Sequence, residues 1–426
     1  MNHACNATAH KTKIRRWTTF TPPQTAAHAA LCGLFLLRRA YTWSDQAILT
    51  PPRTKYPQAV TPNSSFSWRN KRVFLTGHTG FKGGWLALWL TKLGAEVRGY
   101  ALDPSTTPNL LTVARISDTI DDIRGDIRDS ASLDRAMAEF APEVVFHLAA
   151  QPLVRLSYDD PIGTYETNVI GTARVLDAVR RTPSVRAVVS VTTDKCYENK
   201  EWVWAYRESD PLGGYDPYSS SKACAEIVSA AFRQSYFNPA LLYQPGGHTT
   251  AIATARAGNV IGGGDWSLDR LLPDLIQGFT TGEPVRIRRP QATRPWQHVL
   301  EPLHGYILLA EKLLTPSPEA ANFATAYNFG PPEDDAQPVG WIVEKMTQFW
   351  GDGASWTLDP DPGVHEAGYL KLDASRARAD LNWRPRLRLE TALHWIVDWY
   401  RAAGRGEDLQ ALTFRQIAEY EALLRP

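Results

Sequence analysis

From about residue 71, short apolar runs alternate with longer segments whose apolar positions recur at helical spacing. The short runs predict buried strands, and the longer segments predict helices that pack on them. Such alternation is typical of a parallel sheet with helices on both faces, so we expect an α/β fold, a Rossmann-type doubly wound parallel sheet. The expected strands cover 72–76, 96–102, 119–124, 144–148, 187–191 and 250–257.

The alternation loosens after about residue 265. The chain becomes rich in proline and arginine there, and helical patterns return at 303–314, 339–349 and 389–402. We therefore expect a main Rossmann domain at 68–265 and a smaller mixed C-terminal lobe that binds substrate, mainly at 266–426. Some elements of the two parts are expected to be interleaved.

The N-terminal segment differs from the rest in charge and pattern. Residues 1–72 carry eleven Lys or Arg and one acid, whereas the remainder carries 35 Lys or Arg and 44 acids. Proline and threonine clusters without a sustained period predict a disordered extension at 1–67. Three origins stay open: a targeting peptide, a plain tail, or translated upstream sequence with the true start nearer Val60.

Composition excludes several functions. A net charge of +1 argues against a nucleic-acid binder. The apolar stretch Ala29–Leu37 is too short for a membrane span. The four cysteines show no metal or disulfide spacing, which predicts no bound metal and a reducing, cytoplasmic compartment. They are Cys5, Cys32, Cys196 and Cys224.

A glycine motif, Gly77-x-x-Gly80-x-x-Gly83, connects the first expected strand to the first expected helix. Small residues there let backbone N–H groups approach a pyrophosphate at the start of a helix. Asp103, twenty residues beyond Gly83, ends the second expected strand; alone it could be a turn residue before Pro104. With the glycines, its carboxylate predicts binding of a ribose diol, and hence NAD rather than NADP. The expected cofactor contacts are Gly77, Thr79, Gly80, Phe81, Gly83, Asp103, Asp126, Ile127, Leu148, Ala149, Ala150, Tyr218 and Lys222.

A Tyr-x-x-x-Lys pattern at Tyr218 and Lys222 predicts a catalytic pair. On a helix, positions four apart share one face, so the ammonium can stabilise the ionised phenol. That would make Tyr218 a general base for a sugar hydroxyl. Thr193, Asp194 and Lys195 follow the strand at 187–191, where strand ends in open α/β sheets face the ligand crevice. Without further information, this segment could equally be a capped loop with a surface ion pair.

Longer motifs around these residues resemble one family. They are 76–83, 191–201, 206–222, 256–266, 294–298, His365-Glu366 and Leu372-Asp373. From about Trp68 to Tyr400 the chain resembles the CDP-glucose 4,6-dehydratases, which are NAD-dependent enzymes of the extended short-chain dehydrogenase/reductase type.

The resemblance implies a reaction and roles for residues. CDP-glucose would lose water to give CDP-4-keto-6-deoxyglucose, an early step in deoxysugar synthesis for surface polysaccharide such as lipopolysaccharide O-antigen. Tyr218 would take the 4-hydroxyl proton, Thr193 would bind that hydroxyl, and Lys222 would tune Tyr218. Asp194 would protonate the departing hydroxyl. Whether Lys195 is the base at C5 stays open, because lysine is normally charged. The implied substrate contacts are Gln151, Asn259, Arg270, Arg294 and His298.

The implied assembly is a homodimer or homotetramer. Other functions stay open: another NDP-glucose 4,6-dehydratase, a UDP-sugar 4-epimerase of the same fold, or a non-catalytic NAD-binding regulator. An epimerase would need the tyrosine and lysine but not Asp194 and Lys195. A regulator would not need the intact Tyr218–Lys222 pair.

Overall fold

The structure is a computed structural model that describes residues 66–351, 353–360 and 368–425. The expectations for 1–65, and the motif residues His365 and Glu366, lie outside the described residues. None of the described helices combines the length and apolar character that crossing a membrane requires.

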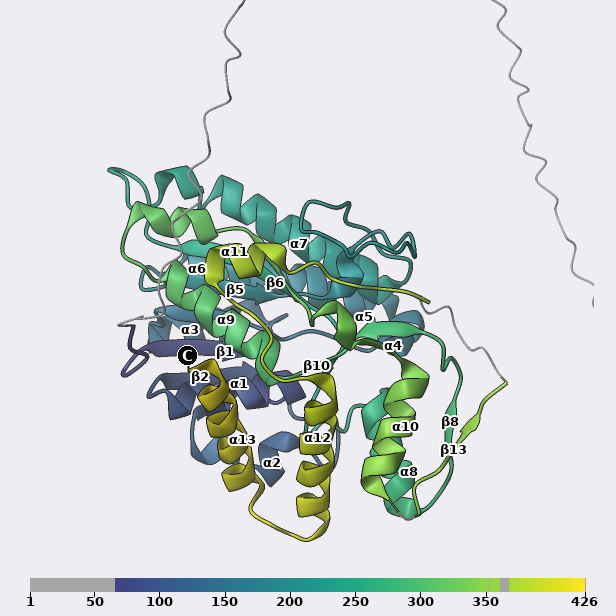
Figure 1. Ribbon diagram of the computed structural model, residues 1–426. Helices are drawn as coiled ribbons and strands as arrows, with labels where there is room; N and C mark the ends of the chain where they lie inside the picture. The colour runs from purple at the N-terminus through teal and green to yellow at the C-terminus, as the bar shows by residue number, and fades with distance from the viewer. Residues whose placement is uncertain (1–65, 352, 361–367, 426) are drawn as a thin grey trace, which may run out of the picture. The chain divides into compact units, whose positions relative to one another are not determined.

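A seven-stranded parallel sheet forms the centre, in the order β11-β6-β5-β4-β1-β2-β3 (Figure 1). The expected fold class is confirmed, and each of the six expected strands is present within two residues of its predicted bounds. The sequence interpretation missed the seventh, β11, whose four residues carry no flanking pattern. The strands are β1 (Arg72–Thr76), β2 (Glu96–Ala101), β3 (Asp121–Arg124), β4 (Val144–His147), β5 (Ala187–Val191), β6 (Ala251–Ala257) and β11 (Ala326–Phe329).

Helices cover both faces of the sheet because its strands are apolar on both sides. In β1, Val73 and Leu75 join one buried cluster while Phe74 joins another. α1 (Phe81–Lys92) and α9 (Leu300–Leu313) pack on the first face, where α13 (Leu409–Leu424) contacts α1. The other face is covered by α3 (Ser130–Phe140), α6 (Gly171–Arg180) and α7 (Pro217–Ser235). This doubly wound arrangement leaves the carboxyl ends of the strands open for a site.

The C-terminal half contributes both to the layers of the sheet and to a separate lobe. β11 and α9 belong to the sheet layers, whereas α8 (Leu271–Thr281), α10 (Val339–Trp350) and the parallel pair β8 (Val285–Ile287) and β13 (Trp356–Leu358) form a separate lobe (Figure 1). α12 (Leu389–Gly404) packs on α10 and α13. The remaining short elements are α2 (Leu110–Val113), α4 (Val154–Asp159), α5 (Pro161–Tyr165), β7 (Val260–Ile261), β9 (Thr293–Pro295), β10 (Gln297–His298), β12 (Ala336–Pro338) and α11 (Ser375–Leu381).

Candidate active site

A cavity of about 750 Å³ runs from the carboxyl ends of the central strands to the start of α8 and to β8. That volume lies within the usual range of small-molecule sites. The glycine motif and Asp103 line one end, and Leu271, Val285 and Ile287 line the other. The tyrosine, threonine and aspartate that the sequence singles out lie along the same cavity.

The glycine motif forms a cradle that no larger residue would fit. Gly77 has a φ of +80°, and a Cβ there would lie 2.7 Å from the backbone nitrogen of Ala149. A Cβ on Gly83 would lie 2.2 Å from the carbonyl oxygen of Gly77. Gly80 is the N-cap of α1, so the first N–H groups of that helix open onto the cavity. This geometry fits the pyrophosphate of a dinucleotide.

All the residues predicted to contact the cofactor line this cavity. Asp103 follows β2 and its side chain is 86% exposed, so its carboxylate is available to a ribose. Asp126 forms an ion pair of 2.7 Å with Arg128 beyond β3. The small residues after β4, Ala149 and Ala150, leave room for a ligand to lie against the backbone. The others in this group are Thr79, Phe81, Ile127, Leu148, Tyr218 and Lys222.

A well-capped helix places the tyrosine and the lysine. Asp216 caps α7 by accepting a hydrogen bond from the backbone nitrogen of Ser219, whose hydroxyl accepts one in return from the Asp216 nitrogen. Tyr218 therefore lies in the first turn, and Lys222 lies one turn later. Both side chains are buried and line the cavity. The tyrosine and the lysine of the predicted pair thus lie on the same side of α7 and face the same cavity.

The pKa of Tyr218 is not lowered by this arrangement. Burial raises it to about 12, against a hydrogen bond with the Thr193 side chain that lowers it. The ammonium of Lys222 donates to the carbonyl oxygen of Val191 at 3.2 Å. Ionisation of the phenol therefore needs further positive charge, of the kind that an oxidised nicotinamide supplies when bound.

Lys222 lies one helical turn from a buried ion pair between Glu226 and Arg256. Burial lowers the pKa of Lys222 to about 8, and Glu226, one turn further along α7, acts in the opposite direction. The Glu226 carboxylate accepts from Arg256 at 2.8 Å, from Thr254 at 2.7 Å and from Thr192. Glu226 thus connects the lysine to the end of β5 that carries the threonine and the aspartate.

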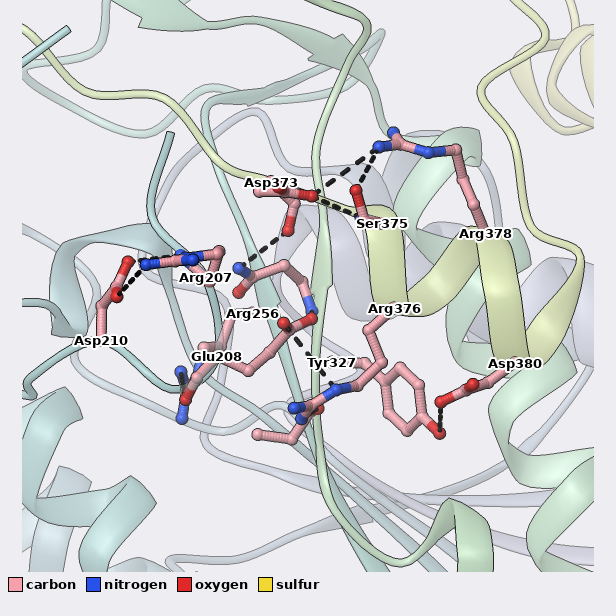
Figure 2. A network of polar contacts seen from close by, with 12 residues as sticks. Arg207, Glu208, Asp210, Arg256, Tyr327, Asp373, Ser375, Arg376, Arg378 and Asp380 are labelled. Carbon is pink, nitrogen blue, oxygen red and sulfur yellow. Dashed lines mark hydrogen bonds and ion pairs between the residues drawn. The ribbon is translucent and has the colours of Figure 1, made fainter. Parts of the chain in front are cut away.

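Arg256 belongs in turn to a polar network that joins β6 to the segment around Glu208 and to α11 (Figure 2). Its guanidinium donates to the Tyr197 hydroxyl at 2.8 Å, and that hydroxyl donates to Asn328 on β11 at 2.7 Å. The Glu208 carboxylate accepts from the Asn328 backbone nitrogen and lies 3.9 Å from Arg376. The network thereby connects β6 and β11 to the segments that contain Tyr197 and Glu208.

Asp194 combines burial with one unused oxygen. It begins a short 3₁₀ turn, 194–196, directly after β5, and it is 2% exposed. Thr193 donates to its Oδ1 at 3.0 Å, whereas its Oδ2 has no hydrogen-bond partner among the described residues. Burial raises the pKa of Asp194, although Lys195, Thr193, Arg294 and Lys82 oppose the shift. A carboxyl in this setting holds its proton to higher pH than usual and can donate it into the cavity.

The residues that the resemblance assigned to substrate fall into two groups. Gln151, Asn259, Arg270 and Arg294 line the cavity. The side-chain amide of Gln151 already donates to the Thr164 hydroxyl at 2.9 Å, so it shapes the wall. Arg294 is 7% exposed, and Arg270 lies 3.8 Å from Asp265.

The expectation for His298 is corrected. This histidine is fully buried on β10 and is not among the residues that line the cavity. Its ring packs edge-on against Trp85 and Trp395, and burial lowers its pKa to about 3. His298 is a neutral core residue, and its proximity to Arg294 in the sequence does not bring it to the cavity.

Sequence reasoning missed Lys82, which lies between Phe81 and Gly83 in the glycine motif. It lines the cavity, and burial lowers its pKa to about 7, with Arg270 and Lys222 acting in the same direction. The available signal was a lysine in the first turn of the first helix, but the sequence interpretation considered only the glycines of this motif. Further basic residues that line the cavity are Arg155, Arg286, Arg288 and Arg289.

A second cavity of about 350 Å³ adjoins the first and shares Val154, Lys195 and Arg294 with it. Its other walls include Glu198, Asn199, Glu201, Tyr215 and Asp216. Lys195 thus lies where the two cavities meet.

Known proteins resemble this chain over most of its length. The family model described as GDP-mannose 4,6 dehydratase matches residues 74–395. A CDP-glucose 4,6-dehydratase from Salmonella typhimurium is 55% identical over 353 residues, which cover 83% of this chain and 97% of that protein. A dTDP-glucose 4,6-dehydratase from Xanthomonas campestris is 28% identical over 346 residues, covering 76% and 92% respectively.

Solved structures show the same fold. A dTDP-glucose 4,6-dehydratase from Bacillus anthracis in complex with NAD has a TM-score of 0.64 at 21% identity, covering 79% of this chain and 98% of that one. A UDP-glucose 4-epimerase from Thermotoga maritima has a TM-score of 0.67 at 20% identity, covering 78% and 99%.

Fold and site together define an NAD-dependent enzyme of the sugar-nucleotide epimerase and dehydratase class. Within that class, the chain belongs to the 4,6-dehydratase family.

Proposed function

We propose that this protein is a hydro-lyase that converts CDP-glucose to CDP-4-keto-6-deoxyglucose. The observation that carries the proposal is Asp194, a buried carboxyl with one unused oxygen in the same cavity as Tyr218 and the glycine cradle. An epimerase needs no acid at that point, whereas loss of hydroxide does. The identity of 55% to a CDP-glucose 4,6-dehydratase supports the choice of nucleotide.

The first half of the reaction uses the pair on α7. NAD held in the glycine cradle would supply the redox chemistry, taking up a hydride from C4 and giving it back at C6 after water has left, when C5 regains its proton from the base. Tyr218 takes the proton of the 4-hydroxyl, and Thr193, within hydrogen-bond reach of that phenol, holds the same hydroxyl. Lys222 provides positive charge beside them while it is protonated, which is the case below its pKa of about 8. The resulting 4-ketone acidifies the proton at C5.

The second half uses the turn after β5. The C5 proton leaves to a base, the C5–C6 double bond forms, and the C6–O bond breaks as Asp194 gives its proton to the departing hydroxyl, which leaves as water. Lys195 borders both cavities, and the role of base at C5 stays open for it. Asn259, Arg270 and Arg294 supply polar and basic groups for a diphosphate.

The substrate assignment has a direct test. The purified protein is incubated separately with CDP-, dTDP-, UDP- and GDP-glucose, and the product is read by mass. Loss of one water from CDP-glucose alone is the expected result. Selective turnover of another nucleotide would overturn the substrate, and inversion at C4 without loss of water would show an epimerase. No turnover of any of them would favour a non-catalytic regulator.

The assembly we propose is a homo-oligomer built on the outer surface of the helices that cover the second sheet face. Ile170, Ile227 and Tyr236 are exposed there by 47%, 57% and 54%, on or beside α6 and α7. Apolar side chains on a helical surface of this kind favour a partner helix pair. Light scattering should give a dimer or tetramer mass, and Ile227→Asp should shift it towards monomer.

The location we propose is the cytoplasm. Cys196 and Cys224 are free thiols, as is usual for cysteines in a reducing compartment. The keto-deoxy product is a precursor for deoxysugars of surface polysaccharide such as O-antigen.

A further inference from the structure

At the end of the cavity that fits the adenosine ribose, the lining residue Asp103 pairs with Arg124, an arginine just outside the lining. Arg124 is the last residue of β3, and its Cα pairs in register with that of Ala101 at the end of β2. Its Nε lies 3.2 Å from Oδ1 of Asp103, and its Nη2 lies 3.0 Å from Oδ2 of Asp122. The Arg124 side chain is 35% exposed. Two carboxylates therefore share one cation next to the ribose site.

The partners of Asp122 leave this corner with net negative charge. Oδ1 of Asp122 lies 2.8 Å from Nε2 of His78, a residue of the glycine motif, and Oδ2 accepts from the Ser117 hydroxyl at 2.6 Å. Burial lowers the pKa of His78, so the ring is neutral at pH 7. The two carboxylates and Arg124 then sum to one negative charge. A ribose diol can donate to Asp103 there, whereas a 2′-phosphate meets a repulsive field.

We infer that Arg124 is a phosphate ligand masked by Asp103, and that this pair decides between NAD and NADP. A guanidinium binds phosphate oxygens readily when its donors are available. Asp103 occupies the Nε edge, so exclusion of NADP has two parts: the charge of Asp103 and the loss of the Arg124 donors. The sequence after Asp103, Pro104-Ser105-Thr106, contains no basic residue. The guanidinium comes instead from the neighbouring strand.

This assignment can be tested with Asp103→Ser, Arg124→Ala and the double variant. Binding of NADP⁺, of NAD⁺ and of adenosine 2′,5′-bisphosphate is measured by titration calorimetry on cofactor-free protein. Asp103→Ser should bind NADP⁺ and the bisphosphate about tenfold or more tightly than the parent, since one charge-assisted hydrogen bond contributes about that factor. The double variant should lose this gain. Arg124→Ala alone should still exclude NADP⁺, because Asp103 keeps its charge.

Arg128→Ala is the matched control, because Arg128 also pairs with a carboxylate, Asp126, at the same sheet edge. Combined with Asp103→Ser, it should leave the gain intact. If the gain persists without Arg124, or if Asp103→Ser brings no gain, the inference is wrong. It rests on the proposed function only in placing NAD in the cavity. Because no assay uses a sugar nucleotide, an error in the substrate would leave these results unchanged.

Discussion

The Thr193 hydroxyl donates to Oδ1 of Asp194 at 3.0 Å, while Oδ2 of the same carboxyl has no hydrogen-bond partner among the described residues. The threonine thereby fixes the orientation of the carboxyl and leaves its second oxygen buried and unpaired in a residue that lines the cavity. An unpaired buried oxygen costs free energy, so its presence needs a reason. A substrate hydroxyl bound beside Oδ2 would give that reason, and the pKa of Asp194, raised by burial, favours a role as proton donor.

Replacement of Asp194 by Asn should separate the two halves of the reaction. The amide keeps the shape but cannot transfer a proton to the leaving hydroxyl, so overall turnover should fall by roughly 10²–10⁴-fold. Oxidation at C4 should continue. With CDP-glucose, the variant should therefore accumulate reduced cofactor, seen by its absorbance, without keto-deoxy product. Product formation at the parent rate would show that another group is the acid.

Tyr218→Phe should fail earlier. Without the phenol, no group in the first turn of α7 can take the 4-hydroxyl proton, so neither reduced cofactor nor product should appear. The ring stays buried and only the hydrogen bond with Thr193 is lost, so stability should fall by only about 1 kcal/mol. Thermal unfolding with and without NAD⁺ controls for damage to the fold. Substantial formation of reduced cofactor by this variant would contradict the role of Tyr218.

The sequence predicted those parts of the site that are local in the chain. The glycine turn, Asp103 and the pair on α7 each depend on one strand end or one helix turn, and each is where the pattern placed it. The prediction that His298 contacts substrate was wrong. It rested on the nearby Arg294, which lines the cavity, whereas the His298 side chain packs in an aromatic cluster. Arg124 and Glu226 carry no sequence signal of their own, because their partners Asp103 and Arg256 come from other segments of the chain and only the fold brings them together.

Acid should destabilise the fold through its buried histidines. His147, His298 and His304 have pKa values lowered to about 3 by burial, so they stay neutral in the folded protein while the unfolded chain titrates near 6.5. Unfolding therefore takes up protons between about pH 6.5 and 3, and each histidine lowers the free energy of unfolding by about 1.4 kcal/mol per pH unit as the pH falls. Glu301, with a pKa raised to about 7, acts in the opposite sense and reduces the net slope.

His298→Gln isolates one of these contributions. The amide does not titrate, so the variant should lose less stability on acidification than the parent, by about 1.4 kcal/mol per pH unit below pH 6.5. Urea unfolding at several pH values measures the difference. Parallel stability curves for the two proteins would show that the buried ring does not control acid sensitivity.

Glu226→Gln should change the pH dependence of the first half reaction. The carboxylate of Glu226 raises the pKa of Lys222, which burial otherwise lowers to about 8. Removal of that charge, with Arg256 left unpaired nearby, should lower the pKa of Lys222 further. Lys222 would then lose its proton at lower pH. The rate of C4 oxidation is followed by the absorbance of reduced cofactor after rapid mixing. As the pH rises, this rate should begin to decline at a lower pH in the variant than in the parent.

Two further variants separate charge from structure. A single loss from a buried ion pair typically costs about 3–5 kcal/mol, so Glu226→Gln will also be less stable. Glu226→Asp keeps the charge while disturbing the contacts, and Thr254→Val removes one hydrogen bond to the carboxylate. Both should be destabilised but should keep the parent pH profile. If Glu226→Gln loses rate equally at all pH values, as a purely structural residue would, Glu226 does not set the protonation of Lys222.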